Sequence, residues 1–347
     1  MRASLPRIFQ NYVCIMALTG LAWLYYHYNP HYQQYFSSTH RWPWFSVSDQ
    51  QLLNNAFWVL AVVFPFYYAT LPDSHVTKSR LVWRALAALP KRVPTAEEKI
   101  ALLATAVKFF FLPLMLAWFF ANGANFLGQV QQFWSTGSLF PHGYWMVFYL
   151  ILFIDVAFFL LAYTVEHPGL HNEIRSVDPT LLGWVVALLC YPPFNGMTNQ
   201  VLGWYSSDYP GFQTAWLQYV AGSIMLVLMT IYVWATVALN LKASNLTHRG
   251  IVTHGPYAYI RHPAYLAKNL AWWVGALPIL ARQYQQGFGE FLFALFCVLT
   301  WSLIYYLRAI TEERHLSFDP VYREYCSRVP RFLPARLLPG RSGFNQR

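Results

Sequence analysis

A polar stretch between positions 245 and 265 has residue types that bind an anion. It reads Asn-Leu-Thr-His-Arg-Gly-Ile-Val-Thr-His-Gly-Pro-Tyr-Ala-Tyr-Ile-Arg-His-Pro-Ala-Tyr. Gly255-Pro256 marks a turn, and Pro263 suits the first turn of a helix, where its missing N–H is not needed. Arg261 and His262 would then lie at a helix N-terminus, whose free N–H groups attract an anion such as a carboxylate.

A second polar cluster begins at Arg308. Arg308 and Glu312 are four residues apart, so a helix places them on one face. Glu313 is adjacent to Glu312, and only one of the two readily shares that face. The pair has two interpretations: an ordinary helix ion pair, or a cation and a carboxylate that face a ligand. Polar groups beside a membrane are costly, which favours the ligand site.

The composition indicates which elements must position these clusters. Of the 347 residues, 56% are hydrophobic and only 11% are charged, whereas soluble proteins have about 25% charged residues. A membrane helix needs about 20 apolar residues. The sequence therefore predicts an all-α fold, a polytopic membrane bundle of about eight transmembrane helices. Their expected ranges are 9–28, 52–71, 101–125, 144–165, 180–195, 213–240, 264–281 and 288–308.

The distribution of charge predicts the topology. Lysines and arginines concentrate in 78–99 and 308–347, whereas the loops 126–143 and 196–212 contain none. Because basic loops stay in the cytoplasm, we expect both termini there, with residues 319–334 forming a cytoplasmic flap. The net charge of +10 then faces anionic membrane lipids. This placement argues against a nucleic-acid partner.

The chain divides by content into two regions. Residues 1–240 form an N-terminal bundle of about six spans, expected to be a scaffold or a substrate region. Residues 241–347 hold the last two spans, the tail and both polar clusters.

Other charged residues suggest weaker hypotheses. Lys108 and Asp155 lie within expected spans; they either pair with each other or mark a functional site. The segment 166–173 has His and Glu at metal-like spacing, but Pro168-Gly169 breaks the helix that a ligand pair would need. We therefore predict no metal site.

The two polar clusters together carry a family resemblance. The stretch 254–265, the Glu312-Glu313 pair and the tail with Tyr322, Tyr325, Val329-Pro330 and Pro334 resemble the isoprenylcysteine carboxyl methyltransferase family. These membrane methyltransferases are related to the phospholipid methyltransferases. The resemblance covers about residues 240–335. The chain departs from the family pattern at Asp319-Pro320, where a glycine turn is usual, and at Lys242, where an amide is usual.

The resemblance implies S-adenosylmethionine as the cofactor. Glu312 would bind it, the stretch 249–252 would line its adenosine end, and Arg308 would face the substrate. The predicted cofactor-binding residues are Arg249, Ile251, Val252, Gly255, Tyr257, Arg261, His262, Pro263, Ala264, Tyr265 and Glu312.

Methyl transfer from a sulfonium is an in-line displacement, so the protein must mainly align the reactants and exclude water. A carboxylate acceptor needs no base, only a cation such as Arg308. An amine, thiol or hydroxyl must lose a proton, and His254, His262 and Glu313 are the candidates to take it. We predict catalytic roles for Arg308, His262 and Glu313.

The expected function is S-adenosylmethionine-dependent methylation of a lipophilic small molecule, a lipid or a lipidated acceptor, at the cytoplasmic side of the membrane. Two alternatives stay open. A membrane sterol or lipid reductase would use NADPH, but its corresponding motif resembles Arg-His-x-Asn-Tyr, and Pro263-Ala264 stands here between His262 and Tyr265. A transporter would depend on Lys108 and Asp155.

Overall fold

The computed structural model describes residues 4–89 and 91–333. Pro334 and the arginines beyond it, which the sequence places in the flap and in the basic tail, lie outside these residues. Within the described chain nearly all regular structure is helical, with two small antiparallel sheets: β1 (Thr39–Arg41) with β2 (Ser46–Ser48), and β3 (Ser176–Val177) with β4 (Thr247–His248). The predicted all-α bundle is confirmed.

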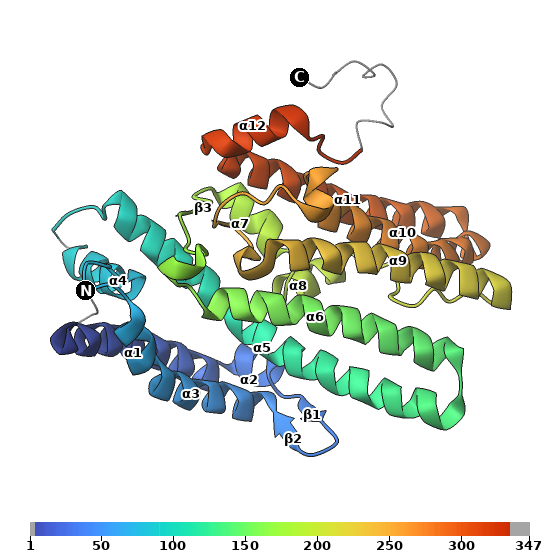
Figure 1. The fold of residues 1–347 in the computed structure, drawn as a ribbon. Coiled ribbons are helices and arrows are strands. Elements are labelled where there is room, and N and C mark those ends of the chain that lie inside the picture. Colours follow the sequence, from blue (N-terminus) through green and yellow to red (C-terminus); the bar gives the residue numbers. More distant parts are fainter. Residues whose placement is uncertain (1–3, 90, 334–347) are drawn as a thin grey trace.

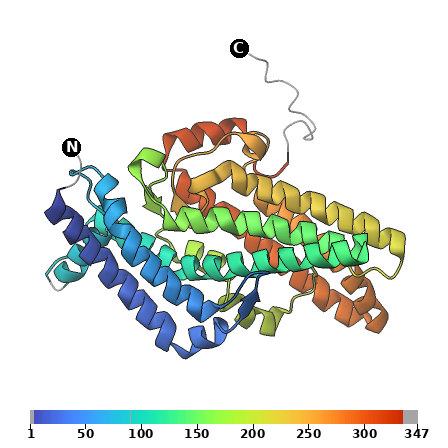
Figure 2. The ribbon, with the colours of Figure 1, turned by 60° about the horizontal axis from the view of Figure 1, so that its bottom comes forward.

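Six described helices are long and apolar enough to cross a membrane. They are α1 (Leu5–Tyr28), α3 (Asp49–Thr70), α5 (Ala96–Thr136), α6 (Tyr144–Thr164), α9 (Ala215–Leu239) and α11 (Phe288–Leu316). The chain is therefore a multi-pass membrane protein. Along the bundle, α5, α6, α9, α10 (Pro263–Gln286) and α11 pack in that order (Figures 1 and 2). The other α-helices of the described residues are α2 (Pro30–Tyr35), α4 (Lys78–Ala88), α7 (Leu181–Leu188), α8 (Phe194–Leu202) and α12 (Pro320–Arg328).

Two of the eight expected spans differ from ordinary membrane helices. The seventh is α10, whose 24 residues make a helix about 36 Å long, but it carries Lys268, Asn269 and Arg282 and is less apolar than the other six. The fifth is not one helix. Its first part, α7, has eight residues and reaches only about 12 Å, because Pro192 and Pro193 prevent the helix from continuing.

The fifth segment continues as α8 and then as irregular chain from Gly203 to Thr214. This irregular part is bonded to the middle of the bundle. The Trp301 indole N–H donates to the Gly203 carbonyl (3.3 Å), and the Ser206 hydroxyl donates to the Trp272 carbonyl (2.7 Å). Non-helical backbone at membrane depth is tolerated where protein satisfies its polar groups. Tertiary contacts, not hydropathy, therefore determine the form of this segment.

Of the two hypotheses for Lys108 and Asp155, the direct pair is not formed. Lys108 Nζ lies 2.8 Å from a Glu166 carboxylate oxygen, whereas Asp155 accepts hydrogen bonds from the Tyr232 hydroxyl (2.7 Å) and Thr236 (2.5 Å). Asp155 faces α9, whereas Lys108 faces Glu166 in the loop after α6, so the two charges have separate partners.

Glu166 links the N-terminal helices to the rest of the bundle. Its carboxylate pairs with Lys78 of α4 and Lys108 of α5 and accepts the Ile174 N–H at 2.9 Å. Burial disfavours the ionised carboxylate, but the two ammonium groups outweigh it and hold the pKa of Glu166 well below its ordinary value. In the segment 166–173, whose His and Glu residues have metal-like spacing, the Glu166 carboxylate is thus already paired with two lysines.

Candidate functional site

The two predicted polar clusters meet at a cavity of about 80 Å³ between α9, α10 and α11. The predicted site residues in its wall are Tyr257, Arg261, His262, Ala264, Tyr265, Arg308 and Glu312. A second cavity of about 40 Å³ reaches the same place from the side of α7, and the two share Ser244, Asn245, Tyr265, Arg308 and Glu312. Tyr265 and Arg308, which are 43 positions apart in the sequence, therefore line one site where the two cavities meet.

Arg308 lies at the junction of the two cavities and is 6% exposed. One guanidinium nitrogen donates to the Asn245 side-chain oxygen at 2.8 Å. The guanidinium carbon is 5.1 Å from the ring centre of Tyr265 and 5.0 Å from that of Tyr305, within the range of a cation–π contact. No ion pair joins Arg308 to a carboxylate in the described part of the chain, so the ordinary helix ion pair with Glu312 is not formed. The guanidinium is oriented but not neutralised.

Tyr265 and Glu312 join α10 to α11 at the edge of the cavity. The Tyr265 hydroxyl donates to a Glu312 oxygen at 2.8 Å, and the Tyr265 ring stacks on His262 with an interplanar angle of 6°. The Glu312 side chain is 44% exposed. Its carboxylate can therefore still accept hydrogen bonds from a ligand.

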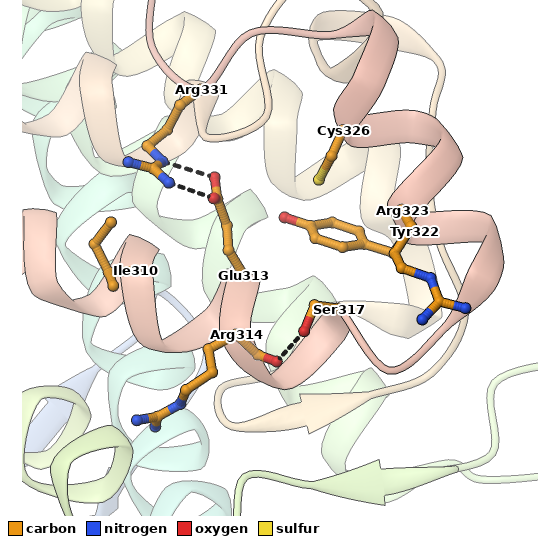
Figure 3. A pocket seen from close by; sticks show the side chains of 8 residues that line it. All are labelled: Ile310, Glu313, Arg314, Ser317, Tyr322, Arg323, Cys326 and Arg331. Atoms are coloured by element: carbon orange, nitrogen blue, oxygen red, sulfur yellow. Dashed lines mark hydrogen bonds and ion pairs between the residues drawn. The ribbon is translucent and has the colours of Figure 1, made fainter.

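Glu313 points to a different place from Glu312. It accepts a hydrogen bond from His262 at 3.0 Å and two from Arg331, at 2.9 and 2.7 Å, and Arg261 lies 3.3 Å away. Figure 3 shows the paired contact with Arg331 at the wall of a third cavity, of about 370 Å³, between α11 and α12. The hydrogen bond to Glu313 raises the pKa of Arg331. Glu313 thus fixes the tail and His262 from outside the central cavity.

The tail also closes the helix start that the sequence predicts as an anion site. The backbone N–H of Arg261 donates to the Pro330 carbonyl (2.9 Å), and that of His262 donates to the Arg331 carbonyl (3.2 Å). The Tyr325 hydroxyl donates to the Tyr257 carbonyl at 2.7 Å, which ties α12 to the same loop. Two of the predicted donors, the N–H groups of Arg261 and His262, are therefore engaged by tail carbonyls.

The residues predicted to line the adenosine end lie apart from the central cavity. Arg249 is 2% exposed and donates to the carbonyls of Ala162 (2.8 Å) and Asn172 (3.1 Å). Burial lowers the pKa of this guanidinium. The other predicted contacts absent from the lining of this cavity are Ile251, Val252, Gly255 and Pro263. Their roles, and that of Arg249, stay predictions.

Sequence reasoning missed several residues of the site. Asn245, Tyr232 and Tyr305 line the central cavity, as does Lys268, which follows Tyr265 by one helical turn. A charge inside an expected span was the available signal for Lys268. By contrast, His254, a predicted candidate for a proton acceptor, is exposed and lies outside the lining of the cavity.

Most residues that line the central cavity lie within residues 215–317, a stretch that matches the model of a methyltransferase family. Together with the membrane helices, this match defines the class: a membrane protein with a methyltransferase-family domain. The model of the isoprenylcysteine carboxyl methyltransferase (ICMT) family matches residues 215–317, which begin with α9 and end at the first residue after α11. The resemblance seen in the motifs is therefore confirmed for this part of the chain. No curated protein and no solved structure matches the chain.

Proposed function

We propose that this protein transfers a methyl group from S-adenosylmethionine to a lipophilic acceptor in the membrane. The observation that carries the proposal is Arg308, a buried guanidinium without a carboxylate partner in the described residues, at the junction of two cavities inside the ICMT-family domain. Because two cavities meet at this one cation, the cofactor and the acceptor could each reach it from a different side.

The donors and acceptors of the central cavity fit this cofactor. Its carboxylate needs a cation, and the cavity offers Arg308 and Lys268. Its ammonium and ribose hydroxyls need an acceptor, which the half-exposed Glu312 supplies. Its sulfonium is a cation, and the rings of Tyr257, Tyr265 and Tyr305 line the same wall; aromatic faces attract cations.

The bound cofactor would supply an electrophilic methyl group, and the protein's residues would align the acceptor with it. Arg308 would hold an anionic acceptor such as a carboxylate, because Asn245 and two tyrosines already fix its orientation. An acceptor that must lose a proton would give it to His262, which lines the cavity. Glu313 would hold His262 in place through their 3.0 Å hydrogen bond.

We place this site at the cytoplasmic end of the bundle. The cavity lies beside the basic segment 242–261 that joins α9 to α10, and Lys78 meets Glu166 near the same end. Basic loops stay in the cytoplasm. The polar cofactor would enter from the cytosol, and the acceptor would enter from the bilayer.

Thermal unfolding of the purified full-length chain tests the cofactor. S-adenosylhomocysteine at about 100 times its Kd should stabilise the wild type by about 2.7 kcal/mol. His262→Ala and Glu312→Ala should lose this response, whereas Glu324→Ala, which removes an exposed carboxylate of α12, should keep it. A response to NADPH and none to S-adenosylhomocysteine would overturn the proposal in favour of a reductase. Transfer of a labelled methyl group to a membrane lipid extract then tests the reaction.

A further inference from the structure

Lys268 is a second cation in the central cavity that lacks a carboxylate partner among the described residues. It lies on α10, and its ammonium nitrogen is 5.1 Å from the ring centre of Tyr232 and 5.7 Å from that of Trp272. A cation inside a membrane helix is costly and is usually paired. Its closest contacts in the described residues are aromatic faces and the cavity, and the carboxylates of Asp155 and Asp208 act on it only from beyond ion-pair distance. A bound anion would supply the missing partner.

The acidic groups nearby make no direct contact with Lys268. Asp155 is held by hydrogen bonds from Tyr232 (2.7 Å) and Thr236 (2.5 Å), and within the described chain neither Asp155 nor Asp208 forms an ion pair with Lys268. Glu312 accepts from Tyr265. Lys268 thus lines the cavity without a carboxylate in direct contact among the described residues.

The other cations in the wall of the cavity have different partners. Arg261 and His262 both contact Glu313. Two cations are left for ligands, Arg308 and Lys268. Arg308 lines both cavities, whereas Lys268 lines only the central one, which also contains His262 and Tyr257. Arg308, at the junction of the two cavities, is therefore suited to bind the acceptor. Lys268, which lines the central cavity alone, is suited to bind the cofactor.

We propose that Lys268 binds the carboxylate at the methionyl end of the cofactor. This inference rests on the proposed function. It replaces the helix start at Arg261 and His262 as the anion site, since the tail carbonyls of Pro330 and Arg331 occupy those N–H groups. Lys268 would act by positioning the cofactor and would take no part in the bond that breaks.

The test compares two ligands that differ only in the carboxylate: S-adenosylhomocysteine and its decarboxylated analogue. Calorimetric titration of the full-length wild type should give a lower Kd for S-adenosylhomocysteine than for the decarboxylated analogue. Lys268→Met should weaken S-adenosylhomocysteine about 10- to 100-fold, because one charge-assisted hydrogen bond is lost, and should abolish the preference. Lys268→Arg should retain most of it. Arg282→Met, which removes a cation about four turns further along α10, should behave as wild type.

Binding of the decarboxylated analogue shows that a variant is folded around its site, and Lys268→Gln serves as a second neutral variant. A preference for the carboxylate that persists in both neutral variants would overturn the role of Lys268 while leaving the proposed function standing. Failure of the wild type to bind S-adenosylhomocysteine would overturn both.

Discussion

The Asn245 side-chain oxygen accepts a hydrogen bond from Arg308 at 2.8 Å, and the Asn245 amide nitrogen donates to the Tyr163 hydroxyl at 3.1 Å. A neutral amide thus holds a buried guanidinium without cancelling its charge. Because Asn245 is in the loop after α9 and Arg308 is in α11, this contact also fixes the loop against the helix.

Replacing Asn245 by Asp should therefore impair use of an anionic acceptor. The aspartate side chain has nearly the same shape and can still accept the hydrogen bond from Arg308, but its carboxylate now pairs with Arg308 and neutralises it. With a farnesylcysteine carboxylate as the probe acceptor, we expect KM to rise about tenfold or more, as for loss of about 1.5–3 kcal/mol. Affinity for S-adenosylhomocysteine should stay near wild type. An unchanged KM would show that Arg308 does not face the acceptor.

Glu313→Gln should loosen the tail. The carboxylate contacts His262, Arg261 and Arg331, and its loss leaves these partners without their anion. Because Arg331 is partly exposed, we expect a loss of about 1–3 kcal/mol in unfolding free energy, below the cost for a fully buried pair. Limited proteolysis between residues 317 and 331 should become faster. Glu324→Gln, at an exposed pair with Arg328, is the matched control and should change neither measurement.

Stability should fall in acid partly because of Glu166. Its pKa in the folded state lies below the ordinary value of 4.5, so the unfolded chain takes up this proton first as the pH drops. The contribution of Glu166 is therefore fully present above about pH 5 and is lost progressively below pH 4.5. Thermal unfolding of the wild type between pH 7 and pH 3.5 should show this loss. Glu166→Gln should be less stable at pH 7 and should show a smaller decrease; an identical pH dependence would contradict the prediction.

Gly275→Ala should destabilise the irregular part of the fifth segment. A Cβ at Gly275 would lie 2.0 Å from the Ser207 carbonyl oxygen, so the backbone must move. Overpacking of this kind costs about 1–3 kcal/mol. Gly128→Ala, in α5, is the control because a Cβ there meets nothing within 4 Å, and alanine favours the helix by up to about 1 kcal/mol. Equal unfolding temperatures for the two variants would exclude close packing of Ser207 on α10.

The sequence by itself determined the membrane bundle and the family of its C-terminal part. Hydropathy is a local property: a helix satisfies its own backbone, so an apolar stretch of sufficient length predicts a span without knowledge of its neighbours. The Arg261–Tyr265 element and the Glu312-Glu313 pair are likewise local patterns, and the family match covers both.

Only the tertiary structure decided which charges are paired and which are free. Sequence spacing left open whether Arg308 pairs with Glu312 and Lys108 with Asp155; in the structure Arg308 bonds to Asn245 and Lys108 to Glu166. The tertiary structure also places Lys268 at the cavity, and it shows that tail carbonyls accept hydrogen bonds from the N–H groups of Arg261 and His262. The physical reason is that ion pairs and hydrogen bonds depend on distances of about 3 Å between side chains, which packing of segments far apart in the chain sets.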